Sequence, residues 1–418
     1  MTEPVSIKQA DGPLAKLARD KFLFCALFVL LLFAQLYGSS LKNVNAPESA
    51  DIQGHDYLSF YAAGRLALEG HPERAYDWPS QRAIQREIAG QVKGGDGYGE
   101  YAIFAYPPTY LTIVTPFAPL PYRLSLLCWL GLTAAVYLAA VFSITESWRS
   151  IVFAAAYPVA LANVLYGQNA FLTAGMIGLA LSMLNARPLL SGFLIGSLAF
   201  KPQLGLAFPL VLLFSRRWLA FSSAALTSKG LLALSMLLFG AKTWQAMLGV
   251  SGFNRSMLLE QGGVGFAQIE SLFGALRYLG LPIWSAYTAQ GALACVVAIA
   301  LIWLWRSSVE YEVKSAGCIG ATLLMTPFLL PYDLLAVVPA VAFLVVLGLR
   351  TGFRSYEKIV LSIVLLTPVA AVLAVRSPVF LAGPIGLLLL FLWTMIRATG
   401  PAGIAWIDSG PKRRFAAQ

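Results

Sequence analysis

The residues best suited to chemistry in this chain are a carboxylate and a lysine, Asp56 and Lys201. A carboxylate beside an apolar helix at a membrane face can accept the proton of a hydroxyl group. A lysine at cavity depth suits a phosphate, because it neutralises the phosphate charge in a site of low dielectric constant. The two residues predict a site that activates a hydroxyl group beside an anionic lipid head group. The substrate pathway of a transporter has a similar composition.

The composition indicates the class of protein that must position these groups. Of the 418 residues, 58% are hydrophobic and 12% are charged, and the mean hydropathy is +0.71. An average soluble domain has about a quarter of its residues charged. Soluble, disordered and disulfide-scaffold classes are therefore excluded, and a polytopic helical membrane protein remains. In such a protein the net charge of +10 reports topology rather than nucleic-acid binding.

The sequence lacks patterns typical of metal, redox or nucleotide sites. The cysteines all lie inside apolar runs and form no CxxC pair, so we expect them to be small apolar residues of the core. His55 and His71 are too far apart in sequence to read as a metal pair. The inner loops are short and contain no P-loop. We therefore predict no metal, no certain cofactor, no nucleotide and no nucleic acid as partners.

The charge distribution predicts the topology. Basic residues of segment 1–21 precede the first apolar run, so we expect a cytoplasmic N-terminus. Residues 22–396 then form a single transmembrane domain with about twelve spans, and the basic tail 397–418 is cytoplasmic. The expected spans are Phe22–Gly38, Tyr122–Phe142, Ile151–Tyr166, Ala170–Leu184, Leu189–Phe200, Gln203–Phe214, Trp218–Phe239, Ile283–Trp305, Ser315–Leu330, Leu334–Leu349, Ile359–Val375 and Val379–Ile396.

Two long loops are expected on the outer side, over residues 39–121 and 240–282. In the first, the apolar spacing that begins at Tyr57 predicts an interfacial helix. The apolar segment Pro107–Pro116 is expected to be re-entrant or interfacial, because counting it as a span would place the later basic loops outside. The spans on either side of Lys201 are short, which places this lysine below the outer surface.

The remaining polar candidates gather on the same predicted side, and several have a plain structural alternative. Asp56 and Asp333 each stand where they could cap a helix, beginning at Tyr57 and Leu334 respectively. Gln168 and Asn169 follow a glycine and could form an ordinary turn. Lys201 could snorkel to the membrane surface. The full set is His55, Asp56, Tyr61, Arg65, Tyr106, Gln168, Asn169, Lys201, Gln203, Arg255, Glu270, Arg277, Tyr332 and Asp333.

Several of these residues belong to motifs that resemble a known family. The motifs are His55-Asp56-Tyr57-Leu-Ser-Phe-Tyr61-Ala-Ala-Gly64-Arg65-Leu, Gly70-His71, Ala75-Tyr76-Asp77, Phe104-Ala-Tyr106-Pro107-Pro108, Leu120-Pro121, Tyr166-Gly167-Gln168-Asn169 and Phe200-Lys201-Pro202-Gln203. In this order they resemble glycosyltransferase family 87, whose members include polyprenyl-phosphate-mannose-dependent mannosyltransferases. The family belongs to the GT-C class of membrane glycosyltransferases.

The resemblance implies a fold and an activity. The fold is all-α, of GT-C type, with juxtamembrane helices in the first outer loop and the active site at the outer face of the cytoplasmic membrane. The implied activity is transfer of a monosaccharide from a polyprenyl-phosphate donor to an acceptor hydroxyl, on a glycolipid or polysaccharide, with inversion. Such an enzyme would take part in envelope glycolipid synthesis.

The resemblance also implies residue roles. Asp56 takes the place of the general base, and Asp51 is the alternative carboxylate. Lys201 is the first choice for the donor phosphate, followed by Arg65, Arg255 and Arg277. The residues expected at the sugar or acceptor are His55, Tyr61, Tyr106, Gln168, Asn169, Gln203, Tyr332 and Asp333.

Two other classes of protein remain open. A transporter or flippase for a lipid-linked sugar also fits twelve spans and a polar cavity, although the long first outer loop and the lack of an inverted repeat count against it. The second is a non-catalytic partner in envelope assembly. The sequence leaves the sugar, the acceptor, the linkage formed, the dependence on a metal and the oligomeric state open.

Overall fold

A computed structural model describes residues 54–93, 102–373 and 381–399, and every regular element in these ranges is a helix. The first expected span, Phe22–Gly38, lies outside the described residues, as do Asp51 and most of both predicted cytoplasmic ends. The helices of the first half are α3 (His55–Leu68), η2 (Pro72–Tyr76), α4 (Trp78–Lys93), α5 (Pro108–Val114), η3 (Thr115–Phe117), α6 (Tyr122–Thr145), α7 (Trp148–Ala156), α8 (Pro158–Tyr166), α9 (Ala170–Met183), α10 (Pro188–Ser197), η4 (Leu198–Phe200), η5 (Pro202–Leu204) and α11 (Ala207–Phe214).

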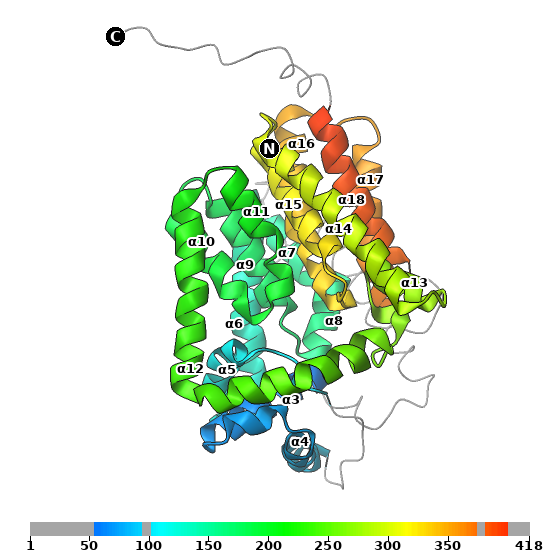
Figure 1. The fold of residues 1–418 in the computed structure, drawn as a ribbon. Coiled ribbons are helices and arrows are strands. Elements are labelled where there is room, and N and C mark those ends of the chain that lie inside the picture. The colour runs from blue at the N-terminus through cyan, green and yellow to red at the C-terminus, as the bar shows by residue number, and fades with distance from the viewer. Residues whose placement is uncertain (1–53, 94–101, 374–380, 400–418) are drawn as a thin grey trace, which may run out of the picture.

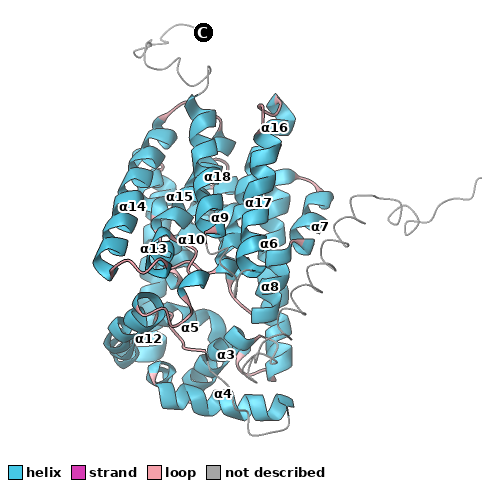
Figure 2. Ribbon diagram, turned by 90° about the vertical axis from the view of Figure 1, so that its right-hand side faces the viewer, coloured by secondary structure: helices cyan, strands magenta, loops and turns pink. Residues whose placement is uncertain are grey.

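The second half contains α12 (Trp218–Arg255), the longest helix of the described chain. It is followed by η6 (Ser256–Glu260), η7 (Phe266–Gln268), α13 (Leu272–Tyr278), α14 (Ile283–Arg306), α15 (Tyr311–Met325), η8 (Pro331–Ala336), α16 (Val337–Thr351), α17 (Glu357–Leu373) and α18 (Ala382–Thr399). Most of these stand side by side, whereas α3 and α4 lie across one end of the molecule (Figures 1 and 2).

Several helices are long and apolar enough to cross a membrane. Five described helices have the length and composition needed to cross a bilayer. A sixth span results if α7 and α8, which meet at an angle of 56° before Pro158, count as one. Shorter apolar helices cover Ala170–Met183, Pro188–Phe200 and Pro202–Phe214. The helices confirm a membrane protein, and the total of twelve spans stays a prediction.

The described part of segment 39–121, the predicted first outer loop, contains short helices, as its pattern indicates. Helix α3 begins two residues before Tyr57. Helix α5 starts at Pro108, where a proline suits the first helical turn, and has 7 residues. At 1.5 Å per residue it is about 10 Å long, far less than the roughly 30 Å needed to cross a bilayer.

The segment 240–282 is largely helical, which differs from the simple loop expected there. Helix α12 passes through Gly240, whose φ of 78° and ψ of 166° break the helical geometry. Beyond this kink the helix turns and runs beneath the upright helices (Figure 1), against α5 and η2. No proline interrupts residues 241–255, so the helical hydrogen bonds continue after the bend.

An aromatic cluster fixes α3 against the upright helices. Tyr57 stacks on Trp129 of α6, with ring centroids 5.9 Å apart. Phe60 meets the edge of Tyr110 of α5 at 5.0 Å, and Tyr110 stacks on Phe200 of η4 at 5.2 Å. Large buried rings remove much apolar surface from solvent, so this cluster gives α3 and α5 a rigid base.

Candidate active site

Asp56 lies in the first turn of α3, where the chain makes a close backbone contact with the end of α8. Gly54 precedes the helix with a φ of 75°, and its N–H donates to the carbonyl of Leu165 at 2.9 Å. Tyr122 donates its hydroxyl to the Gly54 carbonyl, also at 2.9 Å. The helix begins at His55, so Asp56 is not its cap, and the capping alternative is wrong. Its carboxylate is available for other contacts.

The Asp56 carboxylate accepts hydrogen bonds on both oxygens. Gln168 Nε2 donates to Oδ2 at 2.9 Å, and His55 Nδ1 lies 3.3 Å from Oδ1. Tyr106 in turn donates its hydroxyl to Gln168 Oε1 at 3.4 Å. The Asp56 side chain is 23% exposed, so it is oriented by its neighbours and still open to a substrate.

Gly167 allows Gln168 to approach Asp56. It ends α8 with a φ of 70°, and a Cβ placed on it would lie 2.6 Å from Tyr57 Cβ and 3.0 Å from the Gly54 Cα. Its carbonyl accepts a hydrogen bond from Trp129 Nε1 at 3.1 Å. Both the backbone conformation and the close packing therefore require glycine here.

Replacing Gly167 by Ala is expected to lower the free energy of unfolding by about 1–3 kcal/mol, because alanine strains the left-handed backbone and collides with Tyr57. Thermal unfolding in detergent measures the effect. Gly131→Ala is the matched control, because Gly131 lies inside α6 and a Cβ there meets nothing within 4 Å. Equal unfolding temperatures for the two variants would contradict this account of the α3–α8 contact.

Lys201 forms a second, more deeply buried part of the site. It stands between η4 and η5, and its Nζ donates to Asp333 Oδ1 at 2.5 Å and to Asn169 Oδ1 at 3.2 Å. The same Nζ lies 5.4 Å from the centre of the Tyr332 ring. The side chains of Lys201 and Asp333 are 5% and 4% exposed. The lysine is thus held inside the protein by an ion pair and does not snorkel to the surface.

Asp333 has two partners, which explains its fixed position at the start of η8. Besides Lys201, it accepts a hydrogen bond on Oδ2 from the backbone N–H of Leu330 at 3.2 Å. This is the cap-like contact expected of an acidic residue in a first helical turn. The capping alternative for Asp333 is therefore partly right, and the same carboxylate also neutralises a buried charge.

Asn169 and the tyrosines join the two parts. Asn169 Nδ2 donates to the Tyr110 hydroxyl at 3.3 Å, and the Tyr106 and Tyr110 rings lie 4.4 Å apart. Burial, followed by the charge of Asp333, raises the pKa of Tyr106, and Asp56 adds to this effect. The Tyr106 hydroxyl consequently stays protonated and can donate its hydrogen bond. We call the joined residues the Asp56 cluster: His55, Asp56, Tyr106, Gln168, Asn169, Lys201, Tyr332 and Asp333.

Comparison with known sequences identifies the family. The sequence model of glycosyltransferase family 87 matches residues 104–327, more than half of the chain. The chain belongs to glycosyltransferase family 87. The match spans four members of the Asp56 cluster, from Tyr106 to Lys201, and confirms the resemblance read from the motifs. The same comparisons find no match among curated proteins or solved structures.

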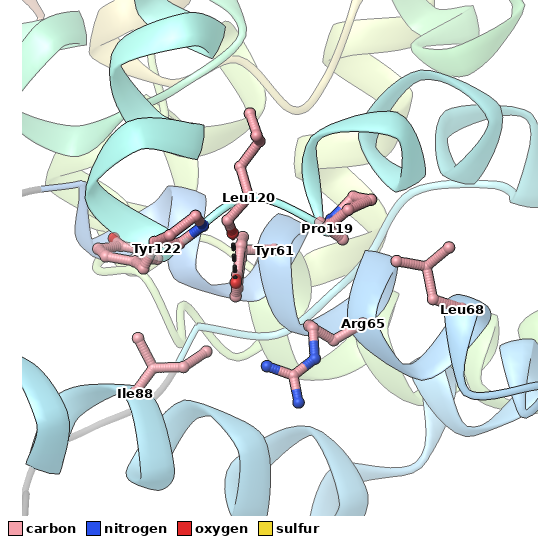
Figure 3. Close-up of a pocket in the computed structure, with 9 residues that line it drawn as sticks. Tyr61, Arg65, Leu68, Ile88, Pro119, Leu120 and Tyr122 are labelled. Carbon is pink, nitrogen blue, oxygen red and sulfur yellow. Dashed lines mark hydrogen bonds between the residues drawn. The ribbon is translucent and has the colours of Figure 1, made fainter.

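Two predicted residues of this family 87 member lie in a separate pocket. Tyr61 donates its hydroxyl to the Leu120 carbonyl at 2.8 Å, and Arg65 bonds Glu69 at 3.2 Å. Figure 3 shows the Arg65 side chain entering the space between α3 and α4. The pocket has a volume of about 420 Å³ and is lined by Tyr61, Arg65, Leu68, Ile88, Ala118, Pro119, Leu120, Pro121 and Tyr122.

The other predicted phosphate ligands of the glycosyltransferase, Arg255 and Arg277, lie within segment 240–282 and bond other parts of it. Arg255 pairs with Glu260, with the charged atoms 3.3 Å apart. Arg277 donates to the carbonyls of Leu281 at 2.7 Å and Glu260 at 3.0 Å. Gln203 is half-buried on η5, two residues after Lys201. The contacts of Arg255 and Arg277 stabilise the segment between α12 and α14.

Sequence reasoning missed residues that position the cluster. Tyr110 bonds Asn169, and Asn163 Oδ1 accepts from the backbone N–H of Ala170 at 3.1 Å. Tyr76 donates its hydroxyl to the Tyr106 carbonyl at 2.9 Å. Only Tyr76 stood in a recognised motif, and polar groups inside apolar runs give little signal of their own. Among the described residues, no three His, Cys, Asp or Glu side chains converge as metal ligands.

Proposed function

We propose that this glycosyltransferase moves a monosaccharide, mannose or another sugar, from a polyprenyl-phosphate donor to an acceptor hydroxyl on a glycolipid or polysaccharide. Membership of family 87 and the apolar helices support a membrane enzyme that uses a lipid-borne substrate. The single observation that carries the proposal is the partly exposed Asp56 carboxylate, which is oriented from two sides at the end of the helix bundle.

In this proposal Asp56 is the general base. An acceptor hydroxyl within about 3 Å gives its proton to the carboxylate as its oxygen attacks the anomeric carbon. The bond from that carbon to the donor phosphate oxygen breaks, and the electron pair leaves with the polyprenyl phosphate. Attack opposite to the leaving group inverts the anomeric configuration. Gln168 and His55 hold the carboxylate in place, and Tyr106, which is partly exposed, binds a sugar hydroxyl.

Lys201 is our first choice for stabilising the leaving phosphate. An ammonium group has three N–H donors. Among the described residues, Asn169 and Asp333 accept two of them, which leaves the third for a phosphate oxygen. Arg255 and Arg277 are engaged in their own segment, so we rank them lower. Arg65 would serve an anionic group bound in its pocket.

The distribution of basic residues supports an active site at the outer face of the cytoplasmic membrane. Arg350 pairs with Glu312 at 2.8 Å, and Arg354 donates to the carbonyls of Ile396 and Arg397. These contacts join the ends of α15, α16 and α18 that are remote from α3 and α4 (Figure 1). Short basic connections favour the cytoplasm, so the opposite end, with Asp56, faces outside.

A reconstituted assay tests the proposal. Purified protein in liposomes receives a polyprenyl-phosphate sugar and a glycolipid acceptor, without an ATP source or an ion gradient. We expect a glycosylated acceptor to accumulate. Movement of the donor between leaflets without product would contradict transfer and support a flippase. If several donor sugars give neither a glycosylated product nor movement of the donor between leaflets, the result would support the non-catalytic alternative.

A further inference from the structure

Glu270 is a buried carboxyl group that the proposed reaction does not use. It lies between η7 and α13, and 1% of its surface is exposed. Its Oε2 has no hydrogen-bond partner among the residues that the structure describes. Burial raises the pKa of Glu270 to about 8, and the backbone N–H of Gly383 acts in the opposite direction. At neutral pH the side chain is therefore an uncharged acid.

The backbone at Glu270 is bonded to the segment that precedes η8. The Glu270 N–H donates to the Leu329 carbonyl at 2.8 Å, and Ser271 Oγ donates to the Pro327 carbonyl at 2.6 Å. Phe328, between these two acceptors, packs against a small apolar core that contains Ile269 and Phe273. These contacts fix the extended segment along its length.

The same segment carries Asp333. Its last residue, Leu330, donates its N–H to Asp333 Oδ2, while Lys201 holds the other oxygen. A displacement of the segment would therefore move the acceptor of the Lys201 ion pair. A continuous series of contacts joins Glu270 to the Asp56 cluster.

The carboxyl group itself packs on the start of α18. A Cβ placed on Gly383 would lie 2.1 Å from Glu270 Oε2, so glycine alone leaves room for this contact. The Glu270 side chain therefore contacts the start of α18, while the backbone N–H of the same residue bonds the segment before η8. An ionised carboxylate without a cation in this place is strongly unfavourable, and it would be driven toward water.

The charged and titratable groups on the neighbouring elements have other partners. Glu260 and Tyr287 bond each other, Arg277 bonds backbone carbonyls, and Asp333 is paired as described above. Within the described ranges, therefore, the contacts of Glu270 include no compensating cation.

We propose that Glu270 is a positioning residue: its side chain packs on the start of α18, its backbone N–H bonds Leu329, and together these contacts fix the segment 326–330 and keep Asp333 in place against Lys201. The effect on sugar transfer rests on the proposed function. The effect on stability does not.

Glu270→Gln, which keeps the shape and stays neutral, tests this proposal by thermal unfolding and by transfer measured across the pH range. Since the folded state binds the Glu270 proton more tightly, its stability falls as the pH rises from about 4.5 to about 8 and levels above that. We expect Glu270→Gln to lack this fall. We also expect wild-type transfer to decline as the pH passes about 8, and Glu270→Gln to retain it.

Glu270→Ala and Glu260→Gln complete the design. Glu270→Ala removes the support and should reduce transfer about tenfold or more below about pH 8, where the wild-type side chain is neutral. Glu260→Gln, in the same outer segment, should keep both wild-type pH profiles. An alkaline decline in Glu270→Gln equal to that of the wild type, or wild-type transfer in Glu270→Ala, would overturn the proposal. If no variant transfers sugar, the proposed function fails, and the unfolding profile of Glu270→Gln still decides the inference.

Discussion

Asp56→Asn is expected to reduce sugar transfer by about a hundred- to ten-thousandfold while the protein folds normally. Asparagine keeps the size of the side chain but cannot accept the proton of the acceptor hydroxyl. The partly exposed position of Asp56 means that no buried charge is uncovered by the change. Initial rates of transfer by purified protein, with unfolding temperature as the measure of folding, check this prediction.

Asp77→Asn is the matched control for this experiment. Asp77 lies in the same outer loop and accepts hydrogen bonds from Ser80 at the start of α4, at 3.0 Å from the backbone N–H and 2.6 Å from Oγ. Asparagine caps helices about as well as aspartate, so transfer should be unchanged. Near-normal turnover in Asp56→Asn would remove Asp56 from the role of base.

Breaking the ion pair between Lys201 and Asp333 is expected to have the largest effect on stability. Asp333→Asn or Lys201→Met leaves an uncompensated charge in a site where both side chains are at most 5% exposed. Losing one partner of a buried pair lowers the free energy of unfolding by about 3–5 kcal/mol. Thermal unfolding of each variant in detergent checks this expectation.

The double variant Lys201→Met with Asp333→Leu separates stability from chemistry. Removing both charges should recover most of the stability, because no unpaired charge remains. Transfer should stay impaired. The apparent affinity for the donor should fall more than that for the acceptor, because the N–H available to the phosphate is lost. Single variants as stable as the wild type would show that the pair is absent, and unchanged donor affinity would reject the phosphate role.

Much of the helical framework follows from the sequence. The helices that begin at Tyr122 and Ile283 start where hydropathy and the preceding prolines place them. The short helix after Pro107 also agrees, because two prolines fix where it can begin. Apolar runs and prolines act locally, so their effects can be read from a single sequence.

The site depended on contacts that local patterns do not contain. Lys201 and Asp333 are 132 residues apart in sequence, and either alone has an ordinary interpretation. Asp56 looked like a cap because the helix was expected to begin at Tyr57. The structure starts it two residues earlier, since Gly54 bonds Leu165 and fixes the first turn. Tertiary contact, rather than helix propensity, therefore decides what the carboxylate can do.

The most direct test of the central claim compares wild-type protein with Asp56→Asn in the same liposomes, measuring both the binding of a polyprenyl-phosphate sugar and its transfer to the acceptor. The account predicts that both proteins bind the donor with similar affinity, that Asp56→Asn transfers the sugar at least about a hundredfold more slowly, and that the product has the inverted anomeric configuration. Transfer by Asp56→Asn at a rate near that of the wild type would contradict it.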